Sequence, residues 1–369
     1  MSNNPDYQIA RPSRATTPEL QFVAPGVWGL RNVFVNVYFV RQHPNSGPWV
    51  LVDAGLPGSA AKLRHTAETL FGANVPPAAI ILTHAHFDHA GSLKTLAESW
   101  DVPVYAHPLE LPYVTGRSSY PPPDPTVGGG AMAALSFLYP KSPYDLGERV
   151  QPFAADGSVP HLPDWRWLHT PGHTPGHASF FRESDRVLLA GDAFCTVQQE
   201  SALAVWAQEQ EVHGPPRYFT CDWHQARHSV ELLAALKPNV AATGHGIPMR
   251  GAALQRELNE LAQHFDELAV PAHGRYVPQP AIADETGVVS VPPPVFDATN
   301  PWLIGAAAAA IGLATAVALS QRRGRTSSKA LHRRMLRQAA AKRQGGATEP
   351  GSIDPFEPTA TYSSPDTTL

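Results

Sequence analysis

The sequence predicts an α/β protein in which two mixed β-sheets carry helices on their outer faces. Strand-like apolar runs alternate with helix-like segments in both halves of residues 20–275, and this alternation is typical of layered α/β folds. Four of the apolar runs are followed within two residues by His or Asp. A hydrophobic fraction of 43% supplies an ample core. We therefore expect one domain over residues 20–275, with a functional site at one rim of its sheets.

The first predicted elements are two strands and a helix. Residues 32–40 and 49–52 are rich in Val, Phe and Tyr, and turn-forming residues 43–48 separate them. A helix should follow, capped at its N-terminus by Ser59. The apolar face of this helix comprises Leu63, Ala67, Leu70 and Phe71.

The next strand leads into the most informative segment of the chain, residues 83–91, which read Thr-His-Ala-His-Phe-Asp-His-Ala-Gly. In an extended segment alternate side chains share a face, so His84 and His86 can converge on one metal ion. The chain should then turn into a helix, where Asp88 and His89 leave at a different angle and can meet a second ion. Four ligands cannot complete two coordination spheres, so we expect further donors downstream.

Three later strand ends supply these donors. His173 lies in the Gly- and Pro-framed loop 169–177, Asp192 follows the apolar run 187–190, and His245 follows residues 240–243. Small residues stand beside them, where the backbone must approach closely. Three other histidines are expected to lie outside the site, and they are His107, His169 and His177.

These residues together resemble the metallo-β-lactamase fold hydrolase superfamily over residues 20–270. The resemblance implies a four-layer αββα sandwich with a dinuclear metal site. The implied ligands are His84, His86 and His173 on the first metal, Asp88, His89 and His245 on the second, and Asp192 as a bridge between them. It also implies that Asp53, at the end of an early strand, supports the ligand loops without binding metal.

The implied chemistry is hydrolysis by a water molecule shared between two divalent ions. Such ions lower the pKa of water toward neutrality and so provide a hydroxide nucleophile. Zinc is preferred, while iron and manganese also suit the ligand set. Asp88, His89 and Asp192 are the expected catalytic residues. The sequence contains no Gly-x-Ser-x-Gly elbow that would indicate a serine nucleophile.

The substrate class is a separate question, because one fold and one metal site serve many activities. Residues 173–177, with Phe180 and Phe181 after them, are similar to the glyoxalase II and lactonase branches, which implies a small ester, thioester or lactone. Two features depart from those branches. Cys195 stands where lactonases commonly carry Tyr, and residues 246–276 contain no clear counterpart of the basic region with which glyoxalase II holds glutathione. A phosphodiesterase and a non-catalytic, membrane-tethered binding protein are the alternatives.

Charge is unevenly distributed along the chain. Residues 321–343 contain nine Lys or Arg and no acid, which leaves 19 basic against 32 acidic residues elsewhere, a net charge of −13. A phosphate backbone favours a basic face, so we expect a small-molecule substrate and no nucleic-acid partner.

Residues 115–150 interrupt the strand and helix pattern with Pro-rich and Gly-rich stretches. A long loop in a compact domain usually has a function or is disordered. We expect either a lid or pocket wall beside the metals or a solvated surface insertion.

The two ends of the chain differ from its centre. Residues 1–19 form a polar extension without the apolar core of a signal peptide. Residues 276–300 are rich in Pro and are expected to form a linker. Residues 302–319 carry no charge, so a transmembrane helix is predicted within 301–320, with an Ala-rich soluble helix as the alternative.

The basic segment 321–343 could lie on anionic lipid, bind an acidic partner or remain a solvated tail. Residues 344–369 are expected to be disordered. The two cysteines, Cys195 and Cys221, fit a reducing compartment. We expect a cytoplasmic hydrolase domain, anchored to a membrane at its C-terminal side if residues 302–319 insert.

Overall fold

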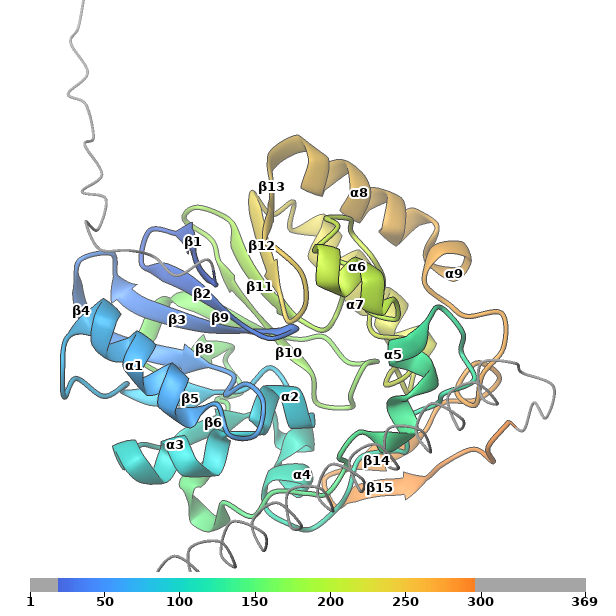
Figure 1. Cartoon of the computed structure of the whole chain (residues 1–369), viewed down its shortest axis with the longest axis horizontal. Coiled ribbons are helices and arrows are strands. Elements are labelled where there is room, and N and C mark those ends of the chain that lie inside the picture. The colour runs from blue at the N-terminus through green and yellow to red at the C-terminus, as the bar shows by residue number, and fades with distance from the viewer. Residues whose placement is uncertain (1–18, 296–369) are drawn as a thin grey trace, which may run out of the picture. The chain divides into compact units, whose positions relative to one another are not determined.

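Two β-sheets stacked face to face form the centre of the fold (Figure 1). The computed structural model describes residues 19–295. The strands of the first sheet follow chain order and are β1 (Leu20–Ala24), β2 (Val27–Asn32), β3 (Val35–His43), β4 (Ser46–Val52), β5 (Ala79–Ile81), β6 (Val104–Ala106) and β7 (Val150–Pro152). Strands β1 to β4 pair antiparallel, and β4 to β7 pair parallel.

The second sheet is also mixed. Its strands are β8 (Ser158–Val159), β9 (Leu162–His169), β10 (Ala178–Arg182), β11 (Val187–Gly191), β12 (Val240–Thr243) and β13 (Met249–Arg250), and they lie in the spatial order β13-β12-β11-β10-β9-β8. Only β11 and β12 pair parallel. Strands β9, β11 and β12 therefore run in the same direction, and their carboxyl ends lie at one edge of the sheet.

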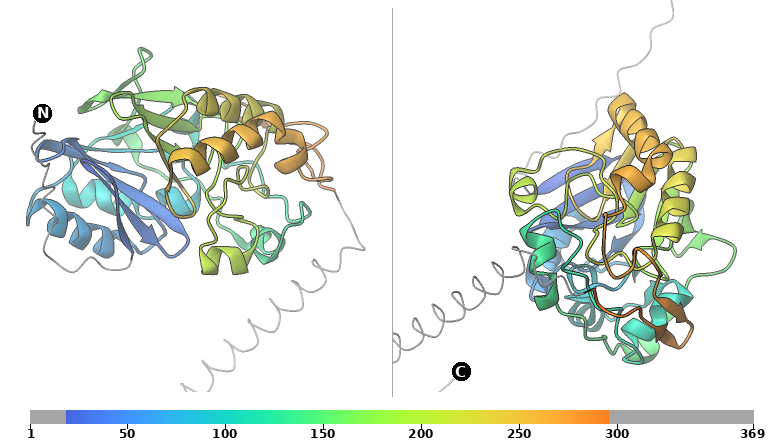
Figure 2. Two further views of the ribbon diagram at one scale, coloured as in Figure 1. Left: turned by 90° about the horizontal axis from the view of Figure 1, so that it is seen from above. Right: turned by 90° about the vertical axis from the view of Figure 1, so that its right-hand side faces the viewer.

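Helices cover the outer face of each sheet. On the first sheet these are α1 (Ala60–Phe71) and α3 (Leu93–Trp100), and on the second α7 (Trp223–Ala235) and α8 (Gly251–Gln263) (Figure 2). The shorter helices are α2 (Phe87–Ala90), α4 (Leu111–Val114), α5 (Ala131–Ala134), α6 (Ala202–Ala207) and α9 (Phe265–Leu268), with 3-10 turns at Pro108–Glu110, Ser136–Leu138 and Gly147–Arg149. The predicted mixed sheets with outer helices are confirmed.

Alternation along the central strands places side chains in three apolar layers. In β4, Leu51 packs under the helices of the first sheet, while its neighbours Val50 and Val52 point between the sheets. In β11, Leu188 packs under α7 and α8 and Leu189 points between the sheets. Successive strand side chains point to opposite faces, so strands with apolar residues on both faces must be covered on both.

Two local predictions need correction. The strand predicted over 32–40 begins at Val35, because Val33 has a φ of 65° at the turn between β2 and β3. Ser59 does precede α1, but its hydroxyl donates to Asn32 Oδ1 at 2.8 Å and does not cap the helix. The tertiary contact with Asn32 replaces the expected local bond.

The segment predicted as a linker folds onto the domain as far as it is described. Within residues 276–295, β14 (Ile282–Asp284) and β15 (Gly287–Ser290) form a hairpin. The hairpin is held by the bond from Val288 N to Ser118 Oγ at 3.1 Å, and the residue just before it by the bond from Ala281 N to Cys221 O at 3.0 Å. Tyr276 is buried in the outer core of the second sheet. Val277, Ala281 and Val291 pack against the same core, and Val288 packs against the outer core of the first sheet, contacts that a free linker would not make.

Other predictions fall on residues that the structure does not describe. These are residues 1–18 of the N-terminal extension, 296–300 of the linker, the predicted membrane helix 301–320, the basic segment 321–343 and the tail 344–369. Between residues 19 and 295, none of the helices has the length and apolar character needed to cross a membrane.

Gly287 tests whether the hairpin stabilises the domain. Its φ is +117°, and a Cβ at this position would overlap Ser118. We expect Gly287→Ala to lower the free energy of unfolding by more than the roughly 1–3 kcal/mol that backbone strain alone costs. Gly58→Ala is the matched control, because Gly58 has a φ of +84° with nothing within 4 Å of a Cβ. Equal losses for both variants in urea unfolding would contradict a stabilising contact.

Candidate metal centre

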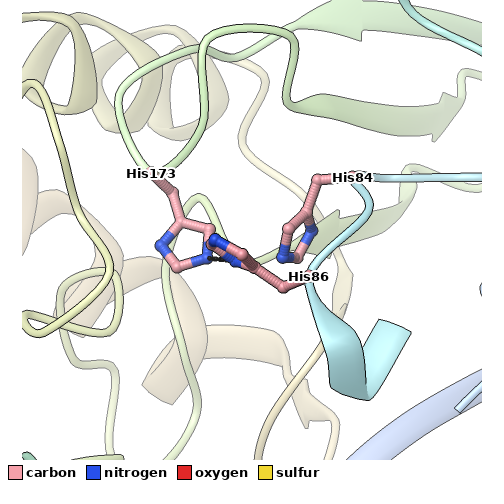
Figure 3. Close-up of side chains that lie close together, drawn as sticks. All are labelled: His84, His86 and His173. Atoms are coloured by element: carbon pink, nitrogen blue, oxygen red, sulfur yellow. Dashed lines mark hydrogen bonds between the residues drawn. The ribbon is translucent and has the colours of Figure 1, made fainter. Parts of the chain in front are cut away.

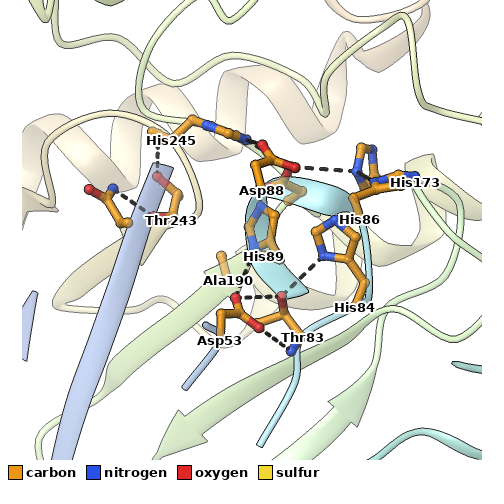
Figure 4. Close-up of polar contacts among 12 residues, drawn as sticks. Asp53, Thr83, His84, His86, Asp88, His89, His173, Ala190, Thr243 and His245 are labelled. Atoms are coloured by element: carbon orange, nitrogen blue, oxygen red, sulfur yellow. Dashed lines mark hydrogen bonds and ion pairs between the residues drawn. The ribbon is translucent and has the colours of Figure 1, made fainter. Parts of the chain in front are cut away.

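All seven predicted ligand residues lie together at one edge of the two sheets (Figure 4). They follow the ends of β5, β9, β11 and β12, with two of them on α2. They are His84, His86, Asp88, His89, His173, Asp192 and His245, and none is more than 5% exposed. Strand ends that are far apart in the sequence thus bring imidazoles and carboxylates into one buried cluster.

The first group within the cluster consists of His84, His86 and His173, whose rings point toward one another (Figure 3). One nitrogen of each ring lies within 4.8 Å of a nitrogen of the other two. His86 Nδ1 and His173 Nε2 are 3.0 Å apart. This is the triad that the sequence predicts for a first metal.

The second group consists of Asp88, His89 and His245, whose ligand atoms also lie within 4.8 Å of one another. Asp192 lies between the two groups. One of its oxygens is 3.5 Å from His173 Nε2 and 3.1 Å from His245 Nε2, and the other is 3.5 Å from His89 Nε2. The Asp192 carboxylate lies close to residues of both groups. A carboxylate that bridges two metals, as predicted for Asp192, would need this position.

Hydrogen bonds behind the cluster fix which ring nitrogen faces inward in every candidate ligand histidine except His86. Thr83 donates its hydroxyl proton to Asp53, so its oxygen accepts from His84 Nδ1 at 3.1 Å. His89 Nδ1 donates to Asp53 at 2.8 Å, and His245 Nδ1 donates to the Phe34 carbonyl at 2.8 Å. In each neutral ring Nε2 is then left with a lone pair directed into the cluster, as a metal ligand requires.

His173 is held in the same way from the loop before α7. Thr220 donates its hydroxyl proton to the Pro216 carbonyl, so its oxygen can accept from His173 Nδ1 at 3.4 Å. The lone pair of His173 Nε2 then faces His86 and Asp192.

Three buried atoms of the cluster have no hydrogen-bond partner among the described residues. They are His84 Nε2, His89 Nε2 and Asp192 Oδ1, and they belong to residues whose ligand atoms converge within 4.8 Å. Unpartnered buried polar atoms are costly and rare in native structures. A divalent cation would satisfy all three, so the residues present fit a metal.

Burial and charge set the protonation of the cluster. Burial lowers the pKa of His84 and His86 well below the usual 6.5, and it lowers that of His173 to about 3. These rings stay neutral, which is the form that binds metal. Burial would also lower the pKa of His89, but the carboxylates of Asp192 and Asp53 raise it well above its usual value. The carboxylates thus attract positive charge into the centre.

In the second group, too, burial and the charges of neighbouring residues shift the pKa values in opposite directions. Burial raises the pKa of Asp88. Burial would raise the pKa of Asp192 too, but His245 and His89 lower it well below 3.8. For His245, contact with Asp192 outweighs burial and raises the pKa.

Asp53 lies behind the ligands, where the sequence predicts a supporting residue. Its carboxylate accepts bonds from Thr83 N, Thr83 Oγ1 and His89 Nδ1, each at 2.8 Å. Its φ of 64° is left-handed, a conformation that Asp tolerates better than most residues. The carboxylate therefore joins the end of β4 to the loop that follows β5 and orients His89.

Gly244 shows why small residues stand beside the ligands. A Cβ there would overlap Asp192 Oδ1 and would lie 2.7 Å from His89 Cε1. The backbone of the loop after β12 can approach the centre only because this side chain is absent.

The prediction that His177 lies outside the site was wrong. Its Nε2 accepts from the backbone N–H of Asp192 at 2.8 Å, while its Nδ1 bonds to Thr170 Oγ1 at 2.8 Å. His177 therefore holds the backbone of the central carboxylate in place. His107 and His169 stack on each other with ring centroids 4.0 Å apart, and within residues 19–295 neither joins a converging ligand group.

Sequence reasoning also missed Glu110, Tyr120 and Phe219. Glu110 is fully buried and bonds to both ligand loops of the first triad, while Tyr120 and Phe219 pack against His86 with ring centroids 4.5 and 4.2 Å away. No local pattern marks these residues. Cys195 is fully buried, and burial raises the pKa of its thiol well above 9.

The chain is similar to proteins of one known family. The model of the metallo-beta-lactamase superfamily matches residues 30–245. The probable metallo-hydrolase YflN of Bacillus subtilis is 48% identical over 245 residues, which cover 66% of this chain and 93% of YflN. The probable metallo-hydrolase YybB of the same organism is 31% identical over 170 residues, which cover 46% of this chain and 64% of YybB.

Among solved structures, the metallo-beta-lactamase family protein TTHA1429 from Thermus thermophilus is 25% identical. The match covers 66% of this chain and 80% of that protein, with a TM-score of 0.45.

Asp53 provides a test of how the ligands are oriented. Asp53→Asn keeps a residue that tolerates positive φ but removes the charge and one acceptor. We expect metal affinity to fall by about 10–100-fold, the usual cost of losing a partner behind a ligand. The matched control is Asp101→Asn, since Asp101 has a φ of 54° and a side chain that is 85% exposed. Metal titration of both variants by calorimetry decides the matter, and unchanged affinity in Asp53→Asn would contradict the orienting role.

Proposed function

This chain belongs to the metallo-beta-lactamase superfamily, and on that premise we propose that it is a hydrolase that uses two divalent metal ions. The family match spans more than half of the chain and includes every residue of the candidate centre. Its relatives YflN and YybB are both named probable metallo-hydrolases.

One observation carries this proposal. Several buried histidines present a lone pair to a common centre, because the other nitrogen of each ring is already engaged. Among the described residues His84 Nε2 and His89 Nε2 have no hydrogen-bond partner, so these rings are ready to bind a cation. When bound, two divalent ions lower the pKa of water and polarise the oxygen of the bond under attack.

The residues of the chain would divide this work. His84, His86 and His173 would hold one ion, and Asp88, His89 and His245 the other. Asp192 contacts both groups and would fix the spacing of the two ions. The ligand set suits zinc best, and iron or manganese would also be accepted by imidazole and carboxylate.

We further propose a small ester, thioester or lactone as substrate. The loop 173–177 supports this class through its similarity to the glyoxalase II and lactonase branches. Phe180 and Phe181 do not add to it, since both are buried in the cores of the domain. Cys195 does not take the place of the lactonase Tyr, because a thiol is only a weak hydrogen-bond donor and this side chain is fully buried.

The surroundings of His86 favour a neutral substrate. Tyr120 and Phe219 pack against the ring of His86, and Tyr139 packs against Phe87 with ring centroids 5.4 Å apart. Two of these residues, Tyr120 and Tyr139, come from the insertion 115–150, which supports its proposed role as a wall beside the metals. Uncharged aromatic side chains suit an apolar acyl group better than a phosphate chain.

A substrate panel tests the proposal. We expect the purified full-length chain, with two equivalents of metal bound, to hydrolyse thioesters or lactones faster than phosphodiesters. Preferential turnover of phosphodiesters would contradict the substrate class. Two bound metals without turnover of any substrate would contradict the hydrolase itself and favour a binding protein.

His86→Ala tests the role of the centre in that activity. Because a ligand is lost, we expect a larger fall in kcat/KM than the roughly 10–100-fold that loss of an orienting partner costs. His228→Ala is the control, since the His228 side chain is 55% exposed on α7. Activity of His86→Ala equal to that of His228→Ala would rule out catalysis at this centre.

A further inference from the structure

A buried carboxylate outside the ligand set joins the two loops of the first triad. Glu110 ends the 3-10 turn Pro108–Glu110 after β6, and its side chain is fully buried. Among residues 19–295 it forms no ion pair with Lys or Arg. Its charge is compensated by hydrogen bonds alone, which makes the identity of the donors important.

Each oxygen of Glu110 serves one loop. One accepts from the backbone N–H of Ala85 at 3.1 Å, and Ala85 lies between the ligands His84 and His86. The other accepts from Thr174 Oγ1 at 2.7 Å and from Gly176 N at 3.0 Å, just after the ligand His173. A single carboxylate thus links the two loops that carry the triad.

Tyr120 adds a second link to the same clamp. Its hydroxyl donates to Glu110 and accepts from Ala85 N at 2.8 Å. Its ring packs against His86, with the centroids 4.5 Å apart. The hydrogen bond to Glu110 therefore also positions the Tyr120 ring that packs against His86.

The loop after His173 is shaped for this contact. A Cβ on Gly176 would lie 2.7 Å from Glu110 N and 2.8 Å from Glu110 Cγ, closer than side chains can approach. Burial raises the pKa of Glu110 to about 7, although all four hydrogen bonds favour the ionised form. Burying the Glu110 carboxyl group costs free energy. The hydrogen bonds that offset this cost come from Tyr120 and from the two loops of the first triad.

We propose that Glu110 is a positioning residue that sets the geometry, and so the metal occupancy, of the His84, His86 and His173 triad. The Asp88, His89 and His245 group does not depend on it. This inference rests on the proposed function, because it presumes that the triad binds a metal.

Glu110→Gln tests the inference in the full-length chain. The Gln side chain has the same shape as Glu, but one of its two oxygens is replaced by an NH₂ group. That NH₂ group would face at least one of the N–H or O–H donors that now bond to the carboxylate. With Co²⁺ as the probe, whose visible absorption reports its coordination, we expect two binding steps in the wild type. In Glu110→Gln the affinity of the triad step should fall by about 10–100-fold, with the other step unchanged.

The matched control is Glu200→Gln. Glu200 is also fully buried and accepts a backbone bond, from Arg217 N at 2.8 Å, but it contacts neither loop of the triad. A general effect of burying an amide would appear in both variants. An effect on the triad spectrum confined to Glu110→Gln supports positioning.

Tyr120→Phe serves if Glu110→Gln does not fold, because it keeps the ring on His86 and removes only the hydroxyl. We expect the same selective loss of the triad step, smaller in size. Two unaltered Co²⁺ steps in the folded variants would overturn the role of Glu110 and leave the proposed function standing. A wild type without any Co²⁺ step would overturn the proposed function instead.

Discussion

The burial of five imidazoles and two carboxylates in one place is the constraint on which the rest of the structure depends. Removing these polar groups from water is costly, and three of their atoms, His84 Nε2, His89 Nε2 and Asp192 Oδ1, have no hydrogen-bond partner among the described residues. The sandwich holds them there because β5, β9, β11 and β12 end at the same rim. Three apolar layers stabilise these strands, so the strand ends cannot separate to expose these groups to water. A site assembled against such a cost is readily explained by a bound cation.

A ring of hydrogen bonds behind the ligands gives the cluster its direction. Asp53, Thr83, Thr220 and the carbonyl of Phe34 each engage the ring nitrogen that faces away from the centre. His177 does comparable work for Asp192 by accepting a bond from its backbone N–H. Ligands oriented in this way need little rearrangement on binding a metal, which lowers the cost of binding.

The insertion 115–150 and the C-terminal hairpin extend the sandwich on the side of the first triad. Tyr120 and Tyr139 bring aromatic rings to His86 and Phe87, and β15 bonds to Ser118. The insertion is therefore tied at several points to the domain. Glu110, buried beneath Tyr120, connects this wall to both loops of the triad. The hydrogen bonds of Glu110 thus support both the loops of the candidate triad and the aromatic side chains of the insertion beside them.

The sequence alone indicated the mixed sheets with outer helices, and its resemblance to a known family indicated the candidate ligand residues. Apolar runs mark strands, and the spacing of His84, His86, Asp88 and His89 after one such run reflects the change from strand to helix. The inward-facing nitrogen of each ring, the role of His177 and the clamp by Glu110 were decided only by tertiary structure. His245 is fixed by a carbonyl 211 positions away, and Glu110 joins Ala85 to Gly176. Such contacts form between segments brought together by packing, so no local pattern in the chain records them.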